Sequence, residues 1–142
     1  MSGLAALLAG RVPTGTYRWH GGFDVADVRH TVEHAGWAFV PLDGVRIESK
    51  EEFLEAAGAA LELPEHAKDS FDALGDLLQD LDPDKGTVVL WDSWGPFARA
   101  DENAFKVALT VLGTRVNAER KAPFAVLLRG DGPEPSGVSS LD

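Results

Sequence analysis

Three apolar runs constrain the fold of this chain most, because each is long enough for a buried strand and none alternates with polar residues. They are WAFVPL at 37–42, TVVLWDSW at 87–94 and PFAVLLR at 123–129. Helical patterns lie between them, and strands buried on both faces are typical of a parallel sheet covered by helices. The sequence therefore predicts an α/β fold, in which Pro41 is expected to end the first of these strands early.

Two helices are expected between the runs. Ser49 and Glu52 form a capping box just before an apolar pair, which predicts a helix from about 50 to 61. A longer helix is expected over 101–119, because apolar residues recur there at helical spacing. These helices would bury one face each against the sheet.

The first 35 residues read as an extension of this α/β domain. Leucines within 4–8 have helical spacing, and 16–20 suits a short strand. Asp24 stands at the N-cap position of a helix over 25–35. We expect the extension to add a strand and a helix to the edge of the sheet.

The expected organisation is an extension at 1–35, a domain at 36–129 and a tail at 130–142. The tail, GDGPEPSGVSSLD, is poor in apolar residues, which predicts disorder. A chain of 142 residues with 44% hydrophobic content is suited to a single globular domain with a core of its own.

The net charge of -10 at pH 7 argues against binding to nucleic acid or to an anionic membrane, and favours a basic protein partner. The chain has no cysteine, so it carries no disulfide and no thiolate metal site, as is common in a reducing compartment. No apolar stretch approaches the roughly 20 residues that span a bilayer, and no secretion signal is recognised at the start. We therefore expect a cytoplasmic monomer.

The segment 64–82 concentrates the negative charge. Read as one helix at about 100° per residue, it places Asp69, Asp76 and Asp80 within about 40° of one another. Asp72 lies about 60° to one side of this stripe, and the leucines occupy the opposite face. The stripe is either a solvated face or a docking surface for a basic cleft, and the charge pattern alone leaves both open.

The run LPEHAKDSFDALGDLL, residues 63–78, resembles the signature of the barstar family. That signature consists of Leu-Pro, an aromatic-rich turn and an Asp-Ala-Leu-x-Asp helix in this order. The surrounding elements agree with it over about residues 36–129. The resemblance implies a small α/β domain with a three-stranded parallel sheet, and inhibition of a barnase-type guanyl-preferring ribonuclease inside the producing cell.

The resemblance also implies which residues bind the partner. Asp72 and Asp76 match the two aspartates that enter the ribonuclease active site, and Asp76 is the expected centre of the interface. The expected partner-binding set is Asp72, Asp76, Asp69, Asp80 and His66.

Three departures from the family pattern leave a second partner class open. His66 and Ala67 stand where the family favours tyrosines, Lys68 replaces a glycine, and Gly75 replaces an aromatic residue that would supply a packing anchor. The alternative is a barstar-fold binding module for another basic toxin or for a regulatory protein.

Other motifs give little support to catalysis, and we expect neither an enzyme nor a cofactor. The run 30–34 fits the H-x-x-E-H spacing of inverted zinc peptidases, but a third ligand is not identifiable, and an exposed amphipathic helix explains the run more simply. The aspartates of one helix form a poor magnesium cage because no ligand faces them. Trp91 and Trp94, at the end of a strand, fit core residues better than a ligand site, with Asp92 and Ser93 capping a turn.

Overall fold

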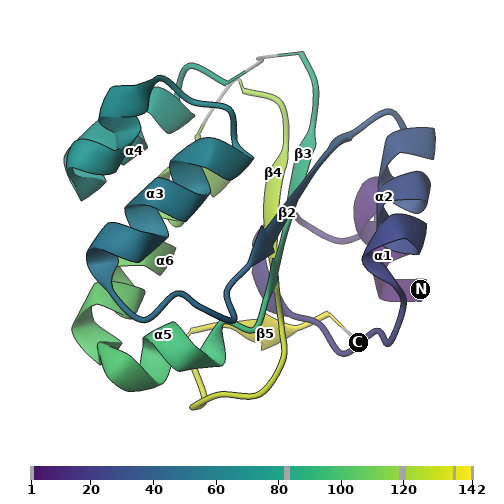
Figure 1. The fold of residues 1–142 in the computed structure, drawn as a ribbon. Helices are drawn as coiled ribbons and strands as arrows, with labels where there is room; N and C mark the ends of the chain where they lie inside the picture. Colours follow the sequence, from purple (N-terminus) through teal and green to yellow (C-terminus); the bar gives the residue numbers. More distant parts are fainter. Residues whose placement is uncertain (1, 82–83, 119–120, 136, 142) are drawn as a thin grey trace.

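The computed structural model describes residues 2–81, 84–118, 121–135 and 137–141, and shows a five-stranded sheet between two layers of helices (Figure 1). In chain order the elements are α1 (Ser2–Leu8), β1 (Thr16–Arg18), α2 (Val25–His34), β2 (Ala38–Asp43), α3 (Lys50–Ala60), the 3-10 helix η1 (Glu65–Asp69), α4 (Phe71–Leu78), β3 (Thr87–Asp92), α5 (Gly95–Ala100), α6 (Glu102–Val116), β4 (Phe124–Arg129) and β5 (Ser139–Ser140).

The strands follow the order β2-β3-β4-β1-β5, and every neighbouring pair is parallel. The α/β class is thus confirmed. The sheet has five strands rather than three, because β1 of the extension and β5 of the tail continue it beyond β4. A strand from the extension was expected, whereas β5 was not. In β3 and β4 the first five residues are all buried, as solid apolar runs predict for strands covered on both faces.

Pro41 does not end β2 early. It pairs in register with Leu90, and the strand continues to Asp43 opposite Asp92. Because β2 is an edge strand, one of its sides is open, and a missing N–H on that side removes no ladder hydrogen bond.

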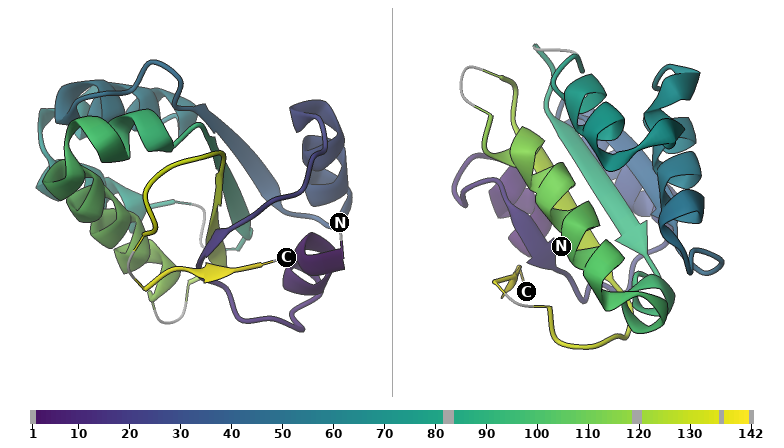
Figure 2. Two further views of the ribbon diagram at one scale, coloured as in Figure 1. Left: turned by 90° about the horizontal axis from the view of Figure 1, so that it is seen from below. Right: turned by 90° about the vertical axis from the view of Figure 1, so that its left-hand side faces the viewer.

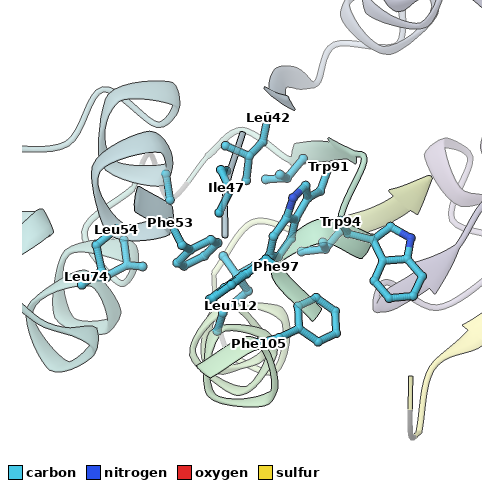
Figure 3. Close-up of a cluster of buried hydrophobic side chains, with 14 of the residues drawn as sticks. Leu42, Ile47, Phe53, Leu54, Leu74, Trp91, Trp94, Phe97, Phe105 and Leu112 are labelled. Atoms are coloured by element: carbon cyan, nitrogen blue, oxygen red, sulfur yellow. The ribbon is translucent and has the colours of Figure 1, made fainter. Parts of the chain in front are cut away.

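The two faces of the sheet carry separate hydrophobic clusters. Helices α1 and α2 cover one face, and α3 to α6 cover the other (Figure 2). Successive side chains of a strand point to opposite faces. Val88 and Leu90 therefore join the α1–α2 cluster, whereas Val89 and Trp91 join the larger one. Figure 3 shows Trp91 in the larger cluster.

The extension folds as part of the sheet. The helix within 4–8, the strand within 16–20 and the helix within 25–35 are confirmed as α1, β1 and α2. Asp24 does precede α2, but its side chain makes no capping hydrogen bond. Strand β1 is not at the edge as expected, because β5 lies beyond it.

The tail differs from the expected disorder in the residues that the structure describes. Strand β5 pairs with β1, and Leu141 N–H donates to the Arg18 carbonyl at 2.8 Å. Glu134 accepts from Arg18 Nη1 at 2.8 Å, and Val138 packs against the larger cluster. Backbone pairing along the edge of β1 requires no apolar side chains, so the composition did not indicate it. Residues 136 and 142 lie outside the described residues.

The β3–α6 connection contains a helix that was not expected. Gly95 and Pro96 do follow the end of β3, but they also begin α5, with the proline in its first turn. Proline suits this position because its fixed φ is helical and the first helical N–H groups have no intrahelical acceptor.

Within the described ranges, no helix is long and apolar enough to cross a membrane.

Candidate functional site

The acidic segment forms two helical pieces rather than one. Ser70 is extended, with φ -166° and ψ 163°, and separates η1 from α4. Its Oγ accepts a hydrogen bond from Ala73 N–H at 3.0 Å, which caps α4. The prediction of a single helix over 64–82 was therefore wrong, and Asp69, Asp76 and Asp80 do not share one helix.

Helix α4 nevertheless presents two carboxylates together. Asp72 and Asp76 are both exposed and stand one turn apart, while Leu74 and Leu78 are fully buried on the other side of the helix (Figure 3 shows Leu74). Like charges at this spacing destabilise a helix by about 0.2–0.5 kcal/mol. The buried leucines hold α4 on the domain in spite of this repulsion.

The other predicted binding residues flank α4. His66 and Asp69 are exposed on η1, before the Ser70 break. Asp80 is exposed just beyond the C-cap residue Gln79. Lys121 Nζ donates to the Gln79 carbonyl at 2.9 Å, so a cation stands at the negative end of the α4 dipole.

Lys68 partly neutralises the η1 side of this surface. Its Nζ lies 2.9 Å from Glu65 Oε1, and this hydrogen bond lowers the pKa of Glu65. The same bond raises the pKa of Lys68, with smaller contributions from the charges of Glu55 and Asp69. Among the described residues, Asp72 and Asp76 on α4 have no such ion pair.

Gly75 lies on α4 next to α6. A Cβ at this residue would lie 3.6 Å from Val111 of α6, which is an ordinary contact distance. A side chain at this position would therefore start beside the α4–α6 contact.

The carboxyl ends of β3 and β4 carry an ion pair that the sequence reasoning missed. Asp92 accepts from Arg129 Nε at 2.6 Å and from Nη2 at 2.9 Å, and this bidentate hydrogen bonding is the main reason that the pKa of Arg129 is raised. Arg129 Nη1 also donates to the carbonyls of Gly21 and Phe23 at 2.9 and 2.7 Å. The guanidinium lies 5.5 Å from the centre of the Trp19 ring. The sequence carried one signal for this pair, since Asp92 and Arg129 have opposite charges and each follows an apolar strand run.

Trp91 and Trp94 are fully buried, as their interpretation as core residues predicts. Both pack against Phe105, with ring centroids 5.6 and 5.4 Å apart (Figure 3). Asp92 pairs with Arg129 instead of capping a turn, and Ser93 adopts a left-handed conformation, with φ 57°.

The H-x-x-E-H run lies on α2, on the other face of the sheet (Figure 1). His30 and His34 are exposed and their rings stack, with centroids 5.9 Å apart. Glu33 lies 3.7 Å from Arg29. In the described part of the chain, no group of three or more His, Asp or Glu side chains is placed to hold a metal ion.

Solved structures similar to this chain come from much longer proteins. The Aeropyrum pernix ORC2 protein (ADPNP-ADP complexes) aligns with a TM-score of 0.62 and 14% identity, over 91% of this chain and 38% of that one. Drosophila ORC bound to GC-rich DNA and Cdc6 aligns with a TM-score of 0.59 and 13% identity, over 94% of this chain and 24% of that one. At such identities the similarity shows the fold alone. No curated protein matches the chain.

The model of one family, Barstar (barnase inhibitor), matches residues 37–129. The matched span runs from β2 to the end of β4 and contains η1 and α4, with all five predicted binding residues. It also agrees with the span over which the sequence resembles the family, and it covers well over half of the chain. The chain therefore belongs to the barstar (barnase inhibitor) family.

Proposed function

We propose that this protein inhibits a basic, guanyl-preferring ribonuclease in the cytoplasm of the producing cell, by placing α4 in the active site of the enzyme. The main support is the position of Asp72 and Asp76, which are exposed one turn apart on a helix within the family-matched span. The inhibitor would act as a monomer, with no nucleic-acid or membrane partner.

Inhibition of this kind requires no chemical step and no cofactor. The carboxylates of Asp72 and Asp76 would take the place of substrate phosphates among the cationic side chains of the enzyme. The net charge of -10 would attract a basic enzyme at long range, and salt would screen this attraction. Salt should therefore slow association, whereas loss of a buried carboxylate should mainly speed dissociation.

Calorimetry with a barnase-type ribonuclease at low and high salt would test the proposal. We expect tight binding that weakens with salt. Asp76→Ala should lose at least about 3 kcal/mol, because it leaves buried cations of the enzyme without a partner. This loss corresponds to about a hundredfold in Kd.

Asp27→Ala is the matched control. It removes one exposed carboxylate from the first turn of α2, on the other face of the sheet, and so changes the net charge equally. It should bind nearly as wild type does. Equal binding by Asp76→Ala and wild type would show that α4 is not the interface, and no binding by wild type would exclude this enzyme class.

A second candidate partner is another basic toxin or a regulatory protein. This candidate is favoured by the ion pair between Lys68 and Glu65. The family pattern has a glycine in place of Lys68, and the ion pair leaves η1 less acidic than α4. A pull-down from the native host, using wild type and Asp76→Ala as baits, would separate the candidates. Recovery of a basic protein without ribonuclease activity by wild type alone would support the second.

A further inference from the structure

The two histidines of α2 form a pair that the proposed inhibitor interface does not use. His30 and His34 are exposed and lie one helical turn apart, on the opposite side of the sheet from α4 (Figure 1). Their rings are nearly parallel, with an interplanar angle of 21° and centroids 5.9 Å apart. The pair therefore presents two imidazoles side by side to solvent.

This spacing is close to what a shared metal ion requires. With Zn–N bonds of about 2.0–2.1 Å in tetrahedral geometry, two coordinated imidazoles have centroids about 5 Å apart. The observed 5.9 Å is near this value, and both side chains are exposed, so small rotations about their side-chain bonds would bring the nitrogens onto one ion.

The surroundings of the pair are compatible with a cation. Arg29, the nearest cation in sequence, lies over the Phe39 ring at 5.1 Å and 3.7 Å from Glu33, so its charge is directed to these groups. His34 is the last residue of α2, where the helix dipole favours positive charge. Neutral imidazoles favour copper, nickel and zinc over magnesium or calcium.

We propose that His30 and His34 together chelate one divalent late-transition-metal ion, of which Cu²⁺ and Zn²⁺ are the class members to test. Two protein ligands leave the remaining coordination positions to water or to a donor from another molecule. The site is thus an open surface site rather than a closed structural one. The ion would bridge two side chains one turn apart on α2, and would therefore bind the folded chain in preference to the unfolded one.

Isothermal titration of the full chain with CuCl₂, ZnCl₂ and MgCl₂ would test the site. We expect one equivalent of Cu²⁺ and of Zn²⁺ to bind, with Cu²⁺ the tighter, and no binding of Mg²⁺. Loss of an outer-shell partner alone costs about 10–100-fold in metal affinity. His30→Asn and His34→Asn should therefore each weaken binding at least about tenfold, because each removes one of the two ligands. The double variant should bind only slightly more weakly than the weaker of the two single variants.

His66→Asn is the matched control, because it removes an exposed histidine from η1, outside the pair. It should bind both metals as wild type does. Unchanged affinity in His30→Asn or in His34→Asn, or an equal loss in His66→Asn, would overturn the proposal. Loss of His30 and His34 ring signals in the NMR spectrum on adding substoichiometric Cu²⁺ provides a second measurement, and selective loss at His66 instead would contradict the site.

Discussion

At the scale of single residues, Gly75 shows what the structure adds to an interpretation drawn from sequence. Compared with its family, the chain lacks an aromatic residue here, and the sequence suggested a missing anchor at the binding surface. In the structure the missing Cβ would face Val111 of α6. A sequence reveals the residue type at a helical position, and the structure adds which neighbouring helix that position touches.

Gly75→Ala should raise the free energy of unfolding by about 1 kcal/mol, because alanine favours the helix and restricts the unfolded chain more than glycine does. The new methyl group would meet Val111 at 3.6 Å, without a clash. Urea unfolding would measure the change. Gly113→Ala in α6 is the control, because nothing lies within 4 Å of its added Cβ and only the helical preference changes. Destabilisation by Gly75→Ala alone would show that the α4–α6 contact cannot admit a methyl group.

At the scale of elements, the sequence predicted those that have strong local signals. The N-cap half of the expected capping box is confirmed, with Glu52 N–H donating to Ser49 Oγ at 3.1 Å at the start of α3. The Glu52 side chain accepts from Glu48 N–H, one residue before the N-cap. The break between η1 and α4 was missed, because Ser70 is followed by alanine rather than glutamate at the third position, and the box pattern is incomplete. Strand β5 was missed because its polar pair of serines is positioned by backbone pairing with β1.

The Asp92–Arg129 ion pair joins three elements, namely β3, β4 and the loop between β1 and α2. Asp92→Ala should lower the free energy of unfolding by about 2 kcal/mol, because it leaves a partly buried guanidinium without its carboxylate. Urea unfolding would again measure this. Asp43→Ala is the control, because Asp43 lies in register with Asp92 but is exposed at the end of the edge strand. This change should lower the free energy of unfolding by less than about 1 kcal/mol. Equal losses in the two variants would argue against a stabilising role for the pair.

At the scale of the whole molecule, the extension and the family-matched domain share one sheet. Sequence patterns indicated the helices and the strand of the extension. They did not indicate that β1 pairs with β4, because pairing between strands distant in sequence leaves no local signal. The apolar face that α1 and α2 cover includes Val88 and Leu90 of β3, which lie inside the matched domain. Without the extension this face would be open to water, so the two parts should unfold together.

Leu7→Ala tests this coupling, because Leu7 belongs to the extension and is 1% exposed. Removing its buried methyl groups should cost about 2–5 kcal/mol. If the parts are coupled, the single urea transition shifts to a lower urea concentration with an unchanged slope. The transitions followed by far-ultraviolet circular dichroism and by tryptophan fluorescence then coincide.

Val107→Ala is the control, because this α6 side chain is 43% exposed, and it should shift the midpoint little. An extra early transition, with the main one at its wild-type position, would show that the extension unfolds independently. The binding surface proposed for α4 would then need no support from the first 35 residues.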